Sequence, residues 1–140
     1  MQVNITSNAK QASKRIGKKG KELAASVKRA LSITAQTGIN IIEARTSKGI
    51  GFKGGKFKAY TPVYAAFRAS KGRGQNPDLQ FTRQMLSSMT SKASSKQAEI
   101  FFTRATESKK AAMNNESRPF FGFSSREEKQ LGEVFFRALK

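Results

Sequence analysis

The sequence predicts an α+β fold with a long amino-terminal helix, a small antiparallel β-sheet or hairpin with short helices, and a capped carboxy-terminal helix. Three observations lead to this class: apolar residues recur three, four and seven positions apart over residues 9–45, strand-forming residues cluster at 98–103, and a helix-capping pattern begins at Ser124. A chain of 140 residues is long enough for one domain. We therefore expect a basic, flexible arm at residues 1–20 and a single α+β domain at 21–140.

Residues 9–45 are predicted to form one long helix, or two helices with a break. Lysine and arginine side chains crowd its first turns, where the helix dipole disfavours positive charge, and Gly17 and Gly20 weaken the same region. For this reason we expect residues 1–20 to stay frayed until a partner binds. The apolar face of the helix consists of Ile16, Leu23, Val27, Ala30, Leu31, Thr34, Gly38, Ile41 and Ile42.

The middle of the chain begins with a Gly/Lys-rich loop at residues 46–60, where four glycines within seven positions disfavour regular structure. Thr61 as an N-cap and Pro62 at the first helical position predict a short helix to about Ser70. Thr82 is a candidate cap for a further short helix.

Residues 87–103 are predicted to form a β-hairpin whose turn lies at 94–96. A short helix is expected at 105–114. Its inward side is predicted to consist of Ala105, Ala112 and Met113.

The final helix has the clearest start signal. Ser124 and Glu127 form a capping-box pattern, and Arg137 and Lys140 place positive charge in the last turn, where the helix dipole favours it. The apolar stripe of this helix consists of Leu131, Val134, Phe135, Ala138 and Leu139.

The charge of the chain is strongly basic and unevenly distributed. The chain has 27 Lys and Arg against nine Asp and Glu, a net charge of +18, and residues 1–75 hold 16 of the basic but only two of the acidic groups. Such an excess attracts a polyanion, with nucleic acid as the first candidate and an acidic protein surface as the second. The alternative is a solvated face without a ligand. The candidate contacts to DNA or to an acidic surface are Lys10, Lys14, Arg15, Lys18, Lys19, Lys21, Lys53 and Lys56.

Catalytic and metal chemistry has few groups to draw on. The chain has no Cys and no His, which excludes thiol and imidazole catalysis and the usual zinc ligands. The glycine-rich run at 49–56 does not match a phosphate-binding P-loop, because Ile50 stands where the first glycine is needed and Phe57 follows Lys56. We expect no catalytic residue, no cofactor-binding residue, no metal site, no enzyme activity and no membrane segment.

Phenylalanine is concentrated just before the final helix, in the run Arg118-Pro119-Phe120-Phe121-Gly122-Phe123-Ser124. Three Phe around a glycine favour a hydrophobic staple that fixes how the chain enters the helix. Alternatively, some of the rings are exposed and fill a pocket on a neighbouring subunit. The candidate core or subunit-contact residues are Phe52, Tyr60, Tyr64, Leu79, Met85, Leu86, Arg118, Pro119, Phe120, Phe121 and Phe123.

This run, followed by an acidic-rich helix, resembles the closing motif of tailed-bacteriophage virion morphogenesis and tail-completion proteins, a family of head–tail joining components. Two upstream segments resemble the family's landmarks in the same order. Residues 54–64 look like its glycine, aromatic, Tyr-Ser-Pro-x-Tyr region, and residues 78–89 look like its Asp-Leu-Thr-x-Thr-Gly-x-Met-Leu-x-Ser-Leu stretch. The similarity spans roughly residues 20–139. The departures are Gln84, in place of the glycine before Met-Leu, and the absence of histidine from residues 111–115.

The resemblance implies a structural protein that forms a ring and performs no catalysis. The partners it implies are further copies of the chain in a closed ring, head proteins on the portal or adaptor side, tail terminator or tail-tube proteins, and genome DNA contacted without regard to sequence. The implied location is the head–tail junction of the virion, with the host cytoplasm during assembly. The alternative is a non-specific, nucleoid-type nucleic-acid-binding protein, which the basic charge alone also allows.

Overall fold

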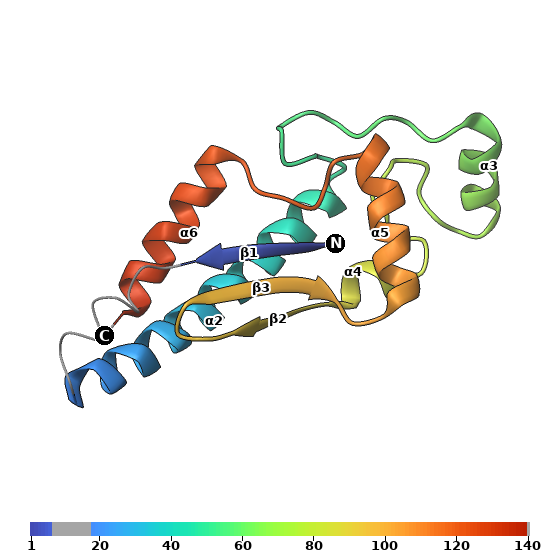
Figure 1. Ribbon diagram of the computed structural model, residues 1–140. Helices are drawn as coiled ribbons and strands as arrows, with labels where there is room; N and C mark the ends of the chain where they lie inside the picture. Colours follow the sequence, from blue (N-terminus) through green and yellow to red (C-terminus); the bar gives the residue numbers. More distant parts are fainter. Residues whose placement is uncertain (7–17, 140) are drawn as a thin grey trace.

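A computed structural model describes residues 1–6 and 18–139 and has the predicted α+β architecture (Figure 1). A three-stranded sheet packs against a long helix, and the carboxy-terminal helix packs against the same long helix. In chain order the elements are β1 (Gln2–Thr6), α2 (Lys18–Ser47), α3 (Pro62–Ser70), α4 (Gln84–Ser87), β2 (Met89–Ala93), β3 (Gln97–Phe102), α5 (Ala105–Ser117) and α6 (Ser125–Ala138).

The sheet has the strand order β1-β3-β2, and both outer strands run antiparallel to β3. Strands β2 and β3 form the predicted hairpin, in which Ala93 lies opposite Ala98. Strand β1 pairs along the other side of β3, with Gln2 opposite Phe101. The start of the chain is therefore joined to a strand near residue 100.

The core lies between one face of α2 and the sheet. Val27, Leu31, Ala35, Ile39 and Ile42 recur every three or four positions along α2, and each is at most 4% exposed. They pack with buried side chains of the sheet, and the half-buried Phe135 of α6 packs against the same cluster. The apolar spacing predicted this face, although Ala35 and Ile39 were not in the predicted set.

Strand β1 contradicts part of the predicted flexible arm. Residues 2–6 form a paired edge strand, not a frayed segment. Val3 and Ile5 alternate with polar residues, and both pack against the core, as the period of two in a strand requires. Their contribution was underestimated because a five-residue strand has little signal of its own beside the lysine-rich stretch that follows.

The described part of the long helix begins at Lys18, whereas the prediction began at residue 9. The predicted positions that lie outside the described residues are Lys10, Lys14, Arg15 and Ile16.

Helix α5 turns a different side toward the core from the one predicted. Ala111 and Glu107 are buried, whereas Met113 is 72% exposed and Ala105 and Ala112 are also exposed. The prediction was wrong because alanine is compatible with either side of a helix. The packing of α5 against β3 and α4 decides which side is buried.

Arg45, near the end of α2, fixes the aromatic run to the start of α6. Its Nη1 donates to both carboxylate oxygens of Glu127, and its Nη2 donates to the carbonyls of Phe120 at 2.6 Å and Gly122 at 3.0 Å. The side chains of Arg45 and Glu127 are only 9% and 17% exposed. Glu127 also accepts from the Ser124 backbone N–H at 3.0 Å, which completes the predicted capping box. One guanidinium therefore holds two carbonyls and the cap of α6 together.

Replacing Arg45 by Met should lower the free energy of unfolding by about 3 kcal/mol, because the carboxylate of Glu127 and two carbonyls would stay largely buried without their donor. Urea unfolding followed by circular dichroism measures this change. The control is Arg126→Met on the exposed side of α6, which should change stability by less than about 0.5 kcal/mol. Equal effects of the two substitutions would show that Arg45 does not clamp the fold.

Candidate functional site

Residues 58–83 form a lobe at one end of the molecule, which we call the α3 lobe (Figure 1). Its helix begins as predicted, since the Thr61 side chain accepts from the Tyr64 backbone N–H at 3.3 Å and Pro62 is the first helical residue. Helix α3 does not pack closely against any other helix or strand of the described chain. The lobe therefore needs polar contacts of its own to hold its shape.

Arg68 supplies these contacts from the centre of the lobe, and its side chain is only 1% exposed. Its Nε donates to the Gly74 carbonyl at 2.8 Å, its Nη2 to Asp78 Oδ1 at 3.0 Å and its Nη1 to the Tyr60 hydroxyl at 3.2 Å. A buried charge is costly unless it is paired and hydrogen-bonded. The path of residues 60–78 is therefore tied to this one side chain.

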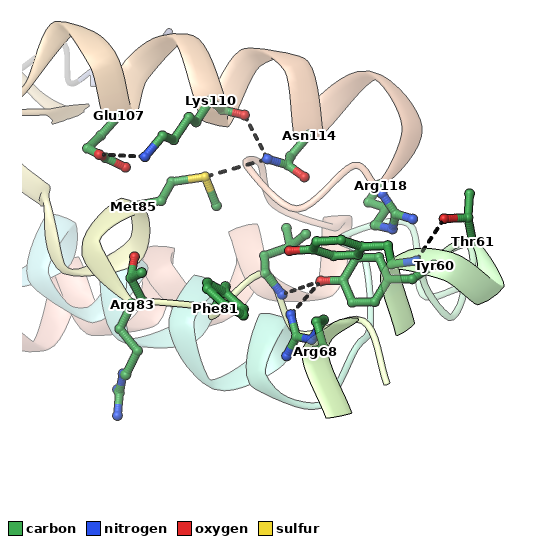
Figure 2. Close-up of a pocket in the computed structure, with 13 residues that line it drawn as sticks. Tyr60, Thr61, Arg68, Phe81, Arg83, Met85, Glu107, Lys110, Asn114 and Arg118 are labelled. Carbon is green, nitrogen blue, oxygen red and sulfur yellow. Dashed lines mark hydrogen bonds and ion pairs between the residues drawn. The ribbon is translucent and has the colours of Figure 1, made fainter. Parts of the chain in front are cut away.

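Tyr60 lies between two guanidinium groups. The Cζ atoms of Arg68 and Arg118 are 4.9 Å and 4.7 Å from the centroid of the Tyr60 ring, and Figure 2 shows them on opposite sides of it. The Tyr60 hydroxyl also accepts from the Leu79 backbone N–H at 3.3 Å. Arg118 donates in turn to two carbonyls just before Tyr60, at 2.7 Å and 3.1 Å. Tyr60 thus joins three parts of the chain.

Two bulky residues of the lobe have a left-handed backbone conformation, which costs on the order of 1–3 kcal/mol. Leu79 has φ 58° and Arg83 has φ 62°. Leu79 is anchored by its buried side chain and by the bond from its N–H to Tyr60. Strain of this kind gathers at sites that clamp a ligand or a partner, so the segment 79–83 is a candidate contact.

These segments surround an open cavity of about 490 Å³ (Figure 2). Tyr60 and Tyr64 line it from the start of the lobe, and Leu79 lines it from the segment before α4. Met85 lines it from α4 and Arg118 from the end of α5. Five of the predicted core or subunit-contact residues, from three distant parts of the sequence, therefore meet at one cavity.

Glu107 of α5 adds a buried carboxylate to the cavity wall, and its side chain is 4% exposed. Its Oε1 accepts from Lys110 Nζ at 3.1 Å, whereas its Oε2 has no hydrogen-bond partner among the described residues. A buried oxygen without a partner is costly, so a donor from outside would stabilise this site. Aromatic walls, fixed cations and an available acceptor suit the binding of a polypeptide segment.

A row of aromatic rings leads from this cavity to the outer surface of α3. The Tyr64 and Phe67 rings stack with centroids 6.2 Å apart, and the Phe67 and Phe81 rings stack at 5.6 Å. Tyr64 and Phe67 are 37% and 46% exposed. Lys71 lies over the Phe67 ring and Arg73 over the Phe81 ring, each at 5.9 Å. The outer surface of the lobe is therefore aromatic with a cationic edge.

The aromatic run before α6 belongs to the core, as the staple interpretation predicted. Phe120 is fully buried and Phe121 is 6% exposed, whereas Phe123 and Phe52 are half-buried. The Phe123 ring packs against Gly38 so closely that a Cβ at that position would lie 2.8 Å from it. The alternative of exposed rings is wrong for Phe120 and Phe121, which are buried. Of the other predicted positions, the buried ones are Leu79, Met85 and Leu86, the half-buried ones are Tyr60, Arg118 and Pro119, and the exposed one is Tyr64.

The predicted basic contacts that the structure describes lie away from this cavity and in two groups. Lys19 and Lys21 are exposed on the first turns of α2, and Lys53 and Lys56 are exposed on the loop after it. The two groups are at opposite ends of a helix of 30 residues, which is roughly 45 Å long. These four lysines therefore form two separate basic patches.

Arg68, Asp78 and Glu107 were missed by the sequence analysis. For Arg68 a usable signal existed, because it is the only charged residue of the otherwise apolar and small α3 sequence. Asp78 is the first acidic residue after Glu43 in a strongly basic stretch, which makes it the natural partner. For Glu107 there was no signal, since a glutamate in the first turn of a helix is common on exposed surfaces.

Among the described residues, no three or more His, Cys, Asp or Glu side chains are grouped to hold a metal ion, and no helix is long and apolar enough to cross a bilayer. Comparisons of the chain with protein-family models, with curated proteins and with solved structures find no match. The functional conclusion therefore rests on the geometry above and on the sequence resemblance.

Tyr60→Phe should lower the free energy of unfolding by about 1–2 kcal/mol, because Arg68 Nη1 and the Leu79 N–H lose the acceptor they share. It should also raise amide hydrogen exchange within residues 60–83. The control is Tyr64→Phe, because the hydroxyl of Tyr64 bonds to no other described residue. Comparable losses in both variants would mean that the Tyr60 hydroxyl does not organise the lobe.

Proposed function

We propose that this chain is a structural subunit of a tailed-bacteriophage virion, which forms a closed ring in the head–tail connector or neck, or completes the tail, around the DNA channel. The observation that supports this best is the meeting of the three family-like segments. Tyr60 of the first segment accepts a hydrogen bond from Leu79 of the second and carries the guanidinium of Arg118 of the third over its ring. The order of segments along a chain does not require contact in space, so this contact is an independent sign that they act together.

The chemistry of the α3 lobe supports binding and assembly without catalysis. The lobe contains guanidinium groups over aromatic rings, backbone carbonyls and one buried carboxylate, which are groups that bind a partner. None of these groups is a nucleophile paired with a base. We therefore propose a role that needs no cofactor and no metal ion.

The partners proposed are other copies of the chain, head proteins on the portal or adaptor side, and tail terminator or tail-tube proteins. Genome DNA passes through the ring. The two basic patches at the ends of α2 suit contact with phosphate groups or with acidic connector surfaces, since both attract lysine without a requirement for sequence. The location that follows is the head–tail junction of the virion, reached from the host cytoplasm during assembly.

A second candidate function is non-specific nucleic-acid binding of the nucleoid type. The observation in its favour is that Lys19, Lys21, Lys53 and Lys56 are exposed and take part in none of the ion pairs found in the described chain. Such lysines are available to replace counterions on DNA.

A phage whose gene for this chain carries an early stop codon should make filled heads and separate tails that do not join, because the ring between them is missing. Electron microscopy of the lysate and plaque counts measure this, and supplying the intact gene in trans should restore both. Fully joined, infectious virions from the mutant would contradict the proposal.

The isolated chain should bind duplex DNA with a dissociation constant weaker than about 1 µM at physiological salt, as expected for contacts made only within an assembly. Fluorescence anisotropy over a salt series measures it. The double variant Lys53→Gln/Lys56→Gln is compared with Lys109→Gln/Lys129→Gln, which removes the same charge from exposed sites elsewhere. Tight binding that falls steeply with salt and is weakened by the first pair alone would favour the nucleoid-type function instead.

A further inference from the structure

Helix α3 presents an apolar surface that nothing in the described chain covers. Over all the residues that the structure describes, seven large hydrophobic side chains are exposed. Three of these seven lie on α3, a helix of only nine residues. They are Val63, Tyr64 and Phe67, which are 82%, 37% and 46% exposed. Exposed apolar residues gathered in this way are typical of a protein-contact surface.

An apolar groove of about 490 Å³ lies between β1, α2 and α6. Val3 and Ile5 line it from β1, Leu31 from α2, and Leu131 and Phe135 from α6. Figure 1 shows α3 and α6 at opposite ends of the molecule. The α3 surface of a copy therefore cannot reach the groove of the same copy.

Gly132 is a second, independent sign that something approaches the groove. It lies in the middle of α6 and lines the groove, and a Cβ at its position would meet no atom within 4 Å. Glycine in the middle of a helix is destabilising relative to alanine. No contact inside the described chain requires it, whereas a partner that packs closely against the α6 backbone would.

The charges of the two surfaces are complementary. Residues 46–75 contain seven basic residues and no acidic one, and Lys71 and Arg73 lie over the rings of the α3 lobe. Among the residues that the structure describes, Glu128 is the only charged one that lines the groove. An apolar surface with a cationic edge thus matches an apolar groove with an acidic edge.

We propose that α3 of one copy docks into the β1–α2–α6 groove of the next copy. This inference rests on the ring-forming function proposed above and names the surfaces that form the ring. The contact joins two different faces, so each copy offers one α3 and one groove, and repetition of the contact closes a ring when the rotation between copies allows it. The groove accepts the Val63, Tyr64 and Phe67 side chains against the bare backbone at Gly132.

Cysteine crosslinking tests this contact directly, because the natural chain contains no cysteine. Protein carrying Val63→Cys is mixed with protein carrying Asn4→Cys, an exposed residue at the groove, and a short bismaleimide is added. The reaction is run at physiological ionic strength, where a Debye length of about 8 Å screens the net charge. We expect covalent heterodimers from the mixture, and a ladder of multimers from the variant that carries both cysteines. The control is Met113→Cys on α5, which is similarly exposed at 72% and should not crosslink to Asn4→Cys.

Filling the groove provides a second test. Gly132→Leu should abolish the Val63→Cys to Asn4→Cys crosslink without lowering the thermal midpoint of the isolated chain, because the position has open space around it. Lys129→Leu adds the same side chain to an exposed position of α6 outside the groove and should leave the crosslink unchanged.

The same crosslinks are then measured in purified virions, which separates this inference from the proposed function. Crosslinking of position 63 to position 4 in the particle supports the docking of α3. Three results would overturn the docking of α3 while the structural role stands. They are a crosslink between two copies of position 63, a crosslink from 113 to 4 as strong as that from 63 to 4, and no crosslink although the chain is present in virions. Absence of the chain from virions would instead overturn the proposed function.

Discussion

A guanidinium group that is buried must be surrounded by acceptors, and this constraint determines how the outer parts of the molecule attach to its core. Arg45 meets it with its two terminal nitrogens, which hold the carbonyls of the aromatic run and the capping glutamate of α6, whereas its Nε has no partner among the described residues. Arg68 meets this requirement by donating hydrogen bonds to Tyr60, Gly74 and Asp78. The α2–sheet core is built by apolar burial, but the α3 lobe is built by these polar contacts. Because the lobe needs few apolar side chains for its own stability, its aromatic surface remains available to a partner.

The distribution of surfaces fits a protein that acts by position and attraction. One end of the molecule carries an exposed aromatic helix with cations over its rings, and α6 at the other end borders an apolar groove with a glutamate. The basic patches occupy the two ends of α2, about the length of that helix apart. The proposed ring around DNA needs such a division, in which a subunit offers different faces to its copies and to a polyanion. Such a ring would hold its shape through apolar contacts, while lysines in contact with phosphate would leave the DNA free to move along it.

What the sequence alone predicted follows from local periodicity. The apolar face of α2, the β2–β3 hairpin and the capping box at Ser124 each depend on residues a few positions apart, and all three are confirmed. The features that the sequence analysis missed depend on contacts between residues far apart in the chain. Strand β1 exists because it pairs with β3 almost a hundred residues later, and Arg118 finds Tyr60 only once α5 has packed on the sheet and α4. The buried side of α5 was mistaken because its alanines carry no preference that packing does not decide. The site residues were predicted as a set, but not as one cavity.

Cryo-electron microscopy of the head–tail junction in purified virions tests the central claim most directly. The account predicts a closed ring of identical subunits around the DNA channel, with density into which this fold fits and with α3 of each copy against α6 of its neighbour. A junction whose rings are all accounted for by other polypeptides would contradict it.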